Sequence, residues 1–241
     1  MKKKSETGHA VNVANLGTLV RRCKSYAAAY QPSNPAIAIV ELEATHAASR
    51  ASIKKVNLVE KTYSKLAGIR RVAFNPLSAL GARILRSFSS CKASAEDINT
   101  AKAAVRKLRG QRAEKKEAPD LENPEEDTQN ISVSQMGFDN RINNFDRLVQ
   151  TVKLEPKYNP NEAELKVSGL EDLHEDLNLK NEAARDAGET LDDARKERDR
   201  LLYAEDTGLV SLAADVKNYV WSVYGPTSTE YKQISGITFR R

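Results

Sequence analysis

A regular three- and four-residue spacing in the second half of the chain constrains the fold most strongly. Ten positions from Leu170 to Leu201 follow this alternating spacing, and they read Leu, Leu, Leu, Lys, Ala, Ala, Leu, Ala, Arg and Leu. This heptad spacing lines one side of an α-helix with residues that pack against partner helices. The sequence therefore predicts a long helix over residues 161–203, with a length of roughly 60 Å at about 1.5 Å per residue.

We call this row of ten positions the seam. The same row recurs 128 residues earlier, at positions 42–73, where it reads Leu, Thr, Ser, Ser, Val, Val, Tyr, Leu, Arg and Ala. Self-similarity at a nearly constant spacing indicates a repeated structural unit, so we expect an internal duplication. Three shorter matches accompany the seam, at offsets of 129, 128 and 134: Asn15-Leu16-x-x-Leu19-Val20 with Asn144-Phe145-x-x-Leu148-Val149, Tyr30-Gln-Pro32 with Tyr158-Asn-Pro160, and Ser94-Ala-Glu96 with Ser228-Thr-Glu230.

The fold class that we expect is all-α, with two tandem elongated helical-bundle units that each contain one long heptad-patterned helix. Charged residues make up 29% of the chain and aromatic residues only 6%, a composition that favours long helices. Asn34 before Pro35 is a helix-start signal, and Gly110 is a helix-end signal. The expected helices cover residues 11–30, 35–74, 77–91 and 94–109 in the first unit, and 140–155, 161–203, 208–224 and 228–234 in the second.

The domain organisation follows from charge and proline content. We expect a basic helical unit over residues 1–110, a charged, proline-containing linker over 111–135 and an acidic helical unit over 136–241. Residues 1–118 carry 23 Lys and Arg against 8 Asp and Glu, a net charge of +15, whereas residues 119–241 carry 15 against 25, a net charge of −10. The linker composition indicates a solvated segment, with a conformational hinge as the alternative.

This charge asymmetry gives two functional hypotheses. Two equivalent units of opposite charge can dock head to tail between copies, which favours a non-enzymatic scaffold or self-assembling structural protein whose partner is itself or another protein. Docking within one molecule would neutralise the same charges without any partner. The alternative function is binding of nucleic acid or another polyanion through the basic first unit.

The polyanion hypothesis depends on exposed basic side chains in the first unit, which can attract phosphate groups. Few aromatic residues are available for base stacking, and no helix-turn-helix or RNA-binding signature occurs in the sequence. The candidate contacts for a polyanion or another partner are Lys54, Lys55, Arg71, Arg83, Arg86, Arg106, Lys107 and Arg109.

Arg70 and Arg198 occupy the same seam position of the two units. Polar seam residues fix the register of packed helices when they find a partner. Our hypothesis is that each arginine reaches a carboxylate on a neighbouring helix. The alternative is that each side chain extends along the seam edge to water.

The most aromatic part of the chain is its C-terminal region, where a candidate interaction patch consists of Trp221, Tyr224, Tyr231 and Phe239. Exposed aromatic side chains are frequent in protein interfaces. The alternative is that these residues cover the core of their own unit, as aromatic residues at the end of a small bundle commonly do.

No catalytic residue, cofactor-binding residue or metal ligand is predicted, and we expect a protein that is not an enzyme. His9, His46 and His174 stand in unrelated settings, and GxGxxG, P-loop, GxSxG and HExxH motifs do not occur. The tract from Glu171 to Asp176 places two carboxylates on one helix face, but it is equally well a solvated face. Cys23 and Cys91 lack the spacing of a zinc site or a disulfide framework.

The expected localisation is cytoplasmic. Lys2-Lys3-Lys4 could begin a signal peptide, but Asn12 and Asn15 interrupt the apolar run that should follow. No stretch of the sequence approaches the roughly 20 apolar residues of a membrane helix.

Three stretches of the second unit carry a resemblance to other proteins: Tyr158-x-Pro160, Arg195-x-x-Arg198-Asp199-x-Leu201-Leu202-Tyr203, and Glu230-Tyr231-Lys232-Gln233-Ile234-x-Gly236-Ile237-x-Phe239. In the first unit, Leu77-Ser78 and Arg106-Lys107-x-x-Gly110-x-Arg112 are similar too. Together they resemble an uncharacterised group of duplicated helical bacterial proteins. This resemblance implies the duplicated helical fold and carries no activity.

Overall fold

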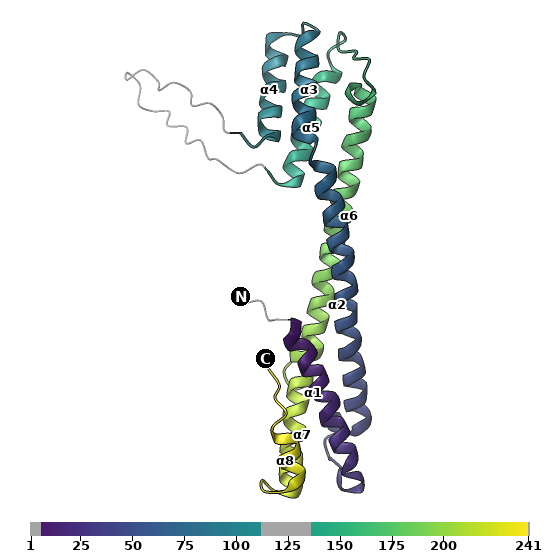
Figure 1. Ribbon diagram of the computed structural model, residues 1–241, viewed down its shortest axis with the longest axis vertical. Helices are drawn as coiled ribbons and strands as arrows, with labels where there is room; N and C mark the ends of the chain where they lie inside the picture. Colours follow the sequence, from purple (N-terminus) through teal and green to yellow (C-terminus); the bar gives the residue numbers. More distant parts are fainter. Residues whose placement is uncertain (1–5, 112–135, 241) are drawn as a thin grey trace, which may run out of the picture. The chain divides into compact units, whose positions relative to one another are not determined.

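The computed structural model of the chain describes residues 6–111 and 136–240, and these residues form an all-helical fold without strands (Figure 1). The predicted all-α class is therefore confirmed. No helix within these ranges is both long and apolar enough to cross a membrane. The helices are α1 (Glu6–Ser25), α2 (Ile39–Phe74), α3 (Leu77–Ser90), α4 (Ala95–Leu108), α5 (Phe138–Lys153), α6 (Val167–Tyr203), α7 (Leu209–Tyr224) and α8 (Thr229–Ser235).

The start of the first long helix differs from its prediction. Asn34 Oδ1 accepts a hydrogen bond from Ala36 N at 3.0 Å, but it caps a single 3-10 turn, Pro35–Ile37. Ala38 then adopts an extended conformation with ψ of 148°, so the α-helix starts only at Ile39. A second 3-10 turn, Ala163–Leu165, precedes α6 in the same way. The start signal at Asn34 thus marks a turn, and each long helix begins after such a turn, with α6 starting at Val167 and not at the predicted residue 161.

Serine hydroxyls cap two of the shorter helices, and the predicted helix end at Gly110 agrees with the structure. Ser94 Oγ accepts a hydrogen bond from Asp97 N at 3.0 Å at the start of α4, and Ser228 Oγ accepts one from Tyr231 N at 3.1 Å at the start of α8. Gly110 follows α4 with φ of +68°, a left-handed conformation that favours glycine. These local signals depend on neighbouring residues alone.

The chain folds into two compact units that each combine residues from both halves of the sequence. Unit 1 comprises Met1–Tyr63 and Ala187–Arg241, and unit 2 comprises Ser64–Asp186. This division differs from the tandem division at residues 1–110 and 136–241, because α2 and α6 each contribute residues to both units. The predicted linker over 111–135 lies outside the described residues, apart from Gln111.

In unit 1, α1, α7 and α8 lie together and cover the first part of α2 and the last part of α6 (Figure 1). Leu16 and Leu19 of α1 are fully buried beside Leu42 of α2, Leu202 of α6 and Val216 of α7. Further along the long helices, a smaller cluster joins Val56 of α2 with Leu191 and Ala194 of α6. The core of this unit therefore requires both halves of the sequence.

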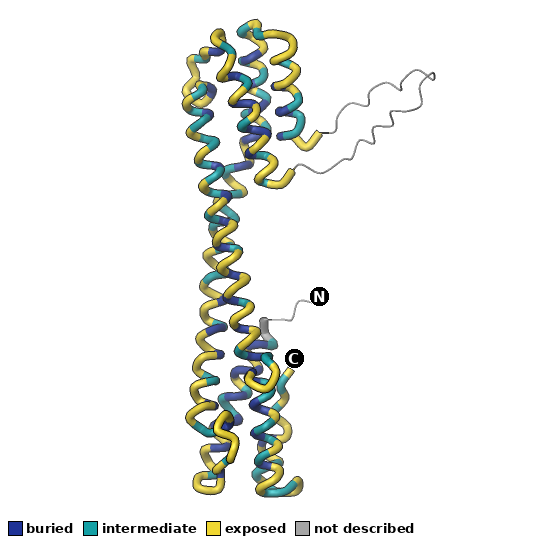
Figure 2. Tube along the Cα trace, turned by 180° about the vertical axis from the view of Figure 1, so that it is seen from behind, coloured by how far each residue is buried: buried dark blue, intermediate teal, exposed yellow. Residues whose placement is uncertain are grey.

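In unit 2, α4 packs against α3 and α5, and the three lie side by side in Figure 1. The core combines Phe74 of α2, Phe88 of α3, Phe145 of α5 and Leu170 and Leu177 of α6. Figure 2 shows the buried positions along the inner faces of these helices. None of the seam positions predicted for α2 and α6 is exposed in either unit.

A buried tyrosine fixes the turn before each long helix. Tyr30 donates its hydroxyl to the Ile37 carbonyl oxygen at 2.8 Å, and Tyr158 donates to the Leu165 carbonyl oxygen at 2.9 Å. Tyr30 is 7% exposed and Tyr158 is 6% exposed. Because a buried hydroxyl must find a partner, each tyrosine ties its loop to the following 3-10 turn.

Gly169 is required by a close backbone approach at the start of α6. A Cβ at this position would lie 2.5 Å from the Ala163 carbonyl oxygen, whereas a Cβ at Gly68 in α2 would meet no atom within 4 Å. We expect Gly169→Ala to lower the free energy of unfolding by about 1–3 kcal/mol through overpacking. Gly68→Ala, the matched control, should raise it by up to about 1 kcal/mol through helix propensity. Urea denaturation of both variants checks this, and equal effects would contradict it.

Candidate functional site

A polar cluster in unit 2 surrounds Arg70, near the end of α2. Its Nη1 donates to Asn181 Oδ1 on α6 at 3.1 Å, and its guanidinium carbon lies 4.1 Å from the centre of the Phe138 ring on α5. Asn181 Nδ2 in turn donates to Asp139 Oδ1 at 2.7 Å. Arg70 thus contacts two neighbouring helices. Our hypothesis was that it reaches a carboxylate directly, but the Asn181 amide lies between Arg70 and the carboxylate of Asp139.

Aromatic packing extends this cluster into the core of unit 2. The rings of Phe74 and Phe138 meet edge to face, with 4.9 Å between their centres. Arg141 donates from Nη2 to the Phe74 carbonyl oxygen at 2.6 Å. Burial lowers the pKa of the Arg141 guanidinium below its ordinary value, although this group stays charged in proteins. These contacts bind the end of α2 to the start of α5.

Arg198, the predicted equivalent of Arg70, is 4% exposed in unit 1. Its Nε donates to Asp199 Oδ1 at 3.1 Å, and its Nη2 lies 3.0 Å from the same oxygen. This carboxylate belongs to the next residue of α6, not to a neighbouring helix. The registry role of both arginines therefore stays a prediction.

The basic residues of the predicted polyanion surface are divided between the two units, so they do not form one surface on a single unit. Lys54 and Lys55 are exposed on α2 within unit 1, and the other six belong to unit 2. Arg83 there pairs with Glu164 at 2.6 Å, and this contact lowers the pKa of the Glu164 carboxyl. Three of the remaining five are exposed, namely Arg71, Arg86 and Arg109. The other two, Arg106 and Lys107, are half-buried.

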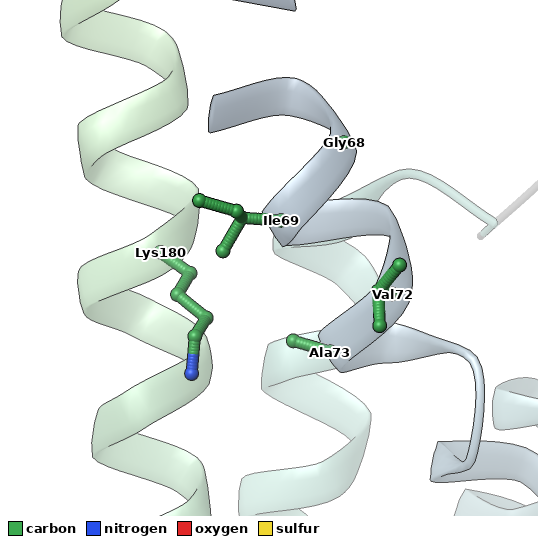
Figure 3. Close-up of a pocket in the computed structure, with 5 residues that line it drawn as sticks. All are labelled: Gly68, Ile69, Val72, Ala73 and Lys180. Carbon is green, nitrogen blue, oxygen red and sulfur yellow. The ribbon is translucent and has the colours of Figure 1, made fainter. Parts of the chain in front are cut away.

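An open apolar groove of about 430 Å³ lies in unit 2, lined by Gly68, Ile69, Val72, Ala73 and Lys180. In Figure 3, Ile69 and Ala73 lie on the side of α2 that faces α6, and the Lys180 side chain extends beside them. Ile69 is 39% exposed and Val72 is 64% exposed. Since Lys180 is the one ionisable lining residue, the groove is suited to apolar packing.

The predicted seam identifies only part of this groove, because it includes Ala73 and Lys180 but neither Ile69 nor Val72. Ile69 and Val72 fall between the seam positions of α2, and Leu179 falls beside Lys180 on α6, where it is 58% exposed. Apolar residues outside a seam are the signal that could have indicated a second contact face.

The C-terminal aromatic residues mostly cover the core of unit 1. Tyr224, Tyr231 and Phe239 are half-buried against this core, and the Tyr224 ring lies 5.6 Å from the ring of Tyr26. Burial raises the pKa of Tyr26 to about 12. Trp221 differs, because half of its surface is exposed. The structure therefore places three of the four predicted patch residues in intramolecular packing.

The acidic tract of α6 makes ion pairs within unit 2. Glu171 pairs with Lys153 at 2.7 Å, and Asp176 pairs with Lys180. His174 of the same tract lies close to Asn178, with 3.4 Å between Nε2 and the amide nitrogen. Within residues 6–111 and 136–240, no group of three or more His, Cys, Asp or Glu side chains is arranged to hold a metal ion.

His9 is paired with a tyrosine, and the two cysteines are free thiols. In unit 1, His9 is 2% exposed, and its Nδ1 lies 2.7 Å from the Tyr203 hydroxyl. Cys23 is buried in the same unit, and burial raises the pKa of its thiol to about 12, which disfavours the reactive thiolate. Cys91 belongs to unit 2 and is also a free thiol.

No protein-family model, curated protein or solved structure matches this chain.

The contact between Arg70 and Asn181 is expected to stabilise unit 2. In a double-mutant cycle of Arg70→Ala and Asn181→Ala, we expect a coupling energy of about 1 kcal/mol, because the two side chains share a hydrogen bond. Arg71→Ala, which removes an exposed neighbour, should change the free energy of unfolding by less than about 0.5 kcal/mol. Denaturant unfolding measures the four proteins of the cycle and the Arg71→Ala control, and additive effects of Arg70→Ala and Asn181→Ala would exclude the registry role of Arg70.

Proposed function

We propose that this protein is a non-enzymatic helical scaffold that self-associates through the apolar groove of unit 2. The exposed apolar residues Ile69 and Val72 in this groove are the observation that carries the proposal. Apolar side chains scattered singly on a surface need no explanation, but apolar side chains gathered in one groove favour a binding surface. A second copy can supply the matching groove, because a two-fold contact places the same patch on both sides.

The ion pair beside the groove supports a contact between identical copies. Lys180 lines the groove and pairs with Asp176, four residues earlier on α6. In a two-fold contact, whatever one copy presents to the other is presented back to it. Because Lys180 and Asp176 are already paired within each copy, a two-fold contact beside the groove need not bury an unpaired charge.

Head-to-tail docking of oppositely charged halves has less support. Unit 1 carries 18 Lys and Arg against 13 Asp and Glu, a net charge of +5, and unit 2 carries 20 against 20. Basic and acidic residues from the two halves already meet within a unit, as Glu60 of α2 does with Arg195 of α6 at 3.0 Å. Charge therefore offers little attraction between unit 1 of one copy and unit 2 of another.

We also propose that the chain arose by internal duplication, with heptad-patterned α2 and α6 as the equivalent long helices. The two tyrosine contacts before these helices support this, because they are 128 residues apart. The ion pairs Lys24–Glu43 and Lys153–Glu171 support it too. Five buried positions of α1 and α5 correspond at an offset of 129: Val13, Leu16, Leu19, Val20 and Cys23 with Ile142, Phe145, Leu148, Val149 and Val152.

Self-association predicts a specific response to a charge in the groove. The wild-type protein should show an average mass that rises with concentration in sedimentation experiments. Val72→Glu should remain monomeric, because burial of a carboxylate in an apolar contact costs free energy. Val40→Glu places the same charge at a residue that is 72% exposed on α2 in unit 1 and should behave as wild type. A wild-type protein that stays monomeric at every concentration and salt would exclude self-assembly.

Binding of nucleic acid or another polyanion is the second candidate function, and the net charge of unit 1 with its exposed Lys54 and Lys55 favours it. Such binding would weaken steeply with salt because phosphate contacts release counterions. We expect the protein to cause no gel shift of generic double-stranded DNA at physiological salt. The double variant Lys54→Ala/Lys55→Ala should give the same result. Tight binding that this double variant weakens would make the polyanion function the main one.

A further inference from the structure

Residues 236–240, which follow α8, run along α1 in unit 1 in the opposite direction. Asn12 Nδ2 donates to the Arg240 carbonyl oxygen at 2.7 Å, and Asn12 Oδ1 accepts from Arg240 N at 3.0 Å. One turn further along α1, Asn15 Nδ2 donates to the Thr238 carbonyl oxygen at 2.7 Å. Two asparagines of one helix therefore bind main-chain groups of alternate residues.

The side chains of this segment alternate in the same way. Ile237 and Phe239 are half-buried against the core of unit 1, whereas Thr238 and Arg240 are exposed. A period of two is the period of an extended backbone. The segment thus offers two apolar side chains to the core and its main chain to Asn12 and Asn15.

Lys217 of α7 completes the contact. Its ammonium group donates to the carbonyl oxygens of Ser235 and Ile237 and lies 5.7 Å from the centre of the Phe239 ring. Burial lowers the pKa of this ammonium group below its ordinary value. A partly buried lysine bound to carbonyl oxygens, like the two asparagines, recognises the backbone and not a particular sequence.

The buried amide of Asn12 makes the site dependent on its occupant. Asn12 is 1% exposed, and its oxygen accepts the hydrogen bond from Arg240. Removal of the segment would take these hydrogen bonds from the Asn12 amide and expose the apolar core that Ile237 and Phe239 cover. A peptide backbone that supplies the same carbonyl oxygen and N–H groups restores these hydrogen bonds.

We propose that Asn12, Asn15 and Lys217 form a binding site for an extended peptide with apolar residues at alternate positions, and that residues 236–240 are its resident ligand. Main-chain hydrogen bonds give such a site its affinity, and the apolar core against which Ile237 and Phe239 pack gives it its specificity. Because the resident segment is tethered through α8, its effective concentration is on the order of millimolar. A peptide from outside therefore gains access only when the segment is displaced. The site is separate from the groove of unit 2 and does not depend on self-association.

The test uses the full-length chain with the resident segment displaced by Phe239→Asp. A fluorescein-labelled peptide with the sequence of residues 236–241 is the probe, and its anisotropy is followed. We expect saturable binding to Phe239→Asp and at least about tenfold weaker binding to wild type, in which the site is occupied. A probe with Ala in place of Thr238 should bind equally well, and one with Ala in place of Phe239 should not.

Two further variants locate the site. Asn12→Ala, added to Phe239→Asp, should weaken the probe about tenfold or more through lost hydrogen bonds. Thr18→Ala is the matched control and should leave binding unchanged, because this half-buried hydroxyl further along α1 donates to the Ala14 carbonyl oxygen. Absence of probe binding by a Phe239→Asp protein with native helical content would overturn the proposal.

A second measurement applies if Phe239→Asp does not fold. Hydrogen exchange in the wild-type chain and in Asn12→Ala is then compared over residues 236–240. We expect at least tenfold faster exchange in this segment in Asn12→Ala, with α7 unchanged, because Arg240 N loses its acceptor. Equal exchange rates in the two proteins would also overturn the proposal.

Discussion

The apolar side of each long helix must be covered, because helices such as α2 and α6, of 36 and 37 residues, bury nothing when isolated in water. The smaller helices that pack against α2 and α6 differ between the two units. In unit 1 the helices before α2 and after α6 cover them, and in unit 2 the helices after α2 and before α6 do so. The arrangement of the smaller helices follows from this requirement for burial.

The distribution of charge follows from the same arrangement. The sequence is basic in its first half and acidic in its second, but each unit takes part of both halves, and unit 2 carries no net charge. Exposed ion pairs such as Arg83–Glu164 contribute little stability each. Their importance is that they leave less uncompensated charge for a partner, so the apolar surfaces become the better candidates for recognition.

The sequence predicts each of the helices α1 to α8, but the observed starts of α1, α2 and α6 differ from the predicted ones by four to six residues. Gly110 follows the end of α4 as expected, whereas Asn34 caps a 3-10 turn, since a local signal does not distinguish the two kinds of helix. The candidate sites depend on residues far apart in the chain. Arg70 meets Asn181, and Asn12 meets Arg240, and no local pattern pairs them. Likewise, apolar periodicity identifies the buried side of α2 without indicating which helices cover it.

Because α2 and α6 pass from one unit into the other, neither half of the sequence contains a complete core. Residues 1–118 lack α7 and α8 of unit 1, and they also lack α5 and α6 of unit 2. Two halves produced as separate chains would therefore each be incomplete in both units. Their association would be fragment complementation, in which both cores form together, and not the docking of two finished domains.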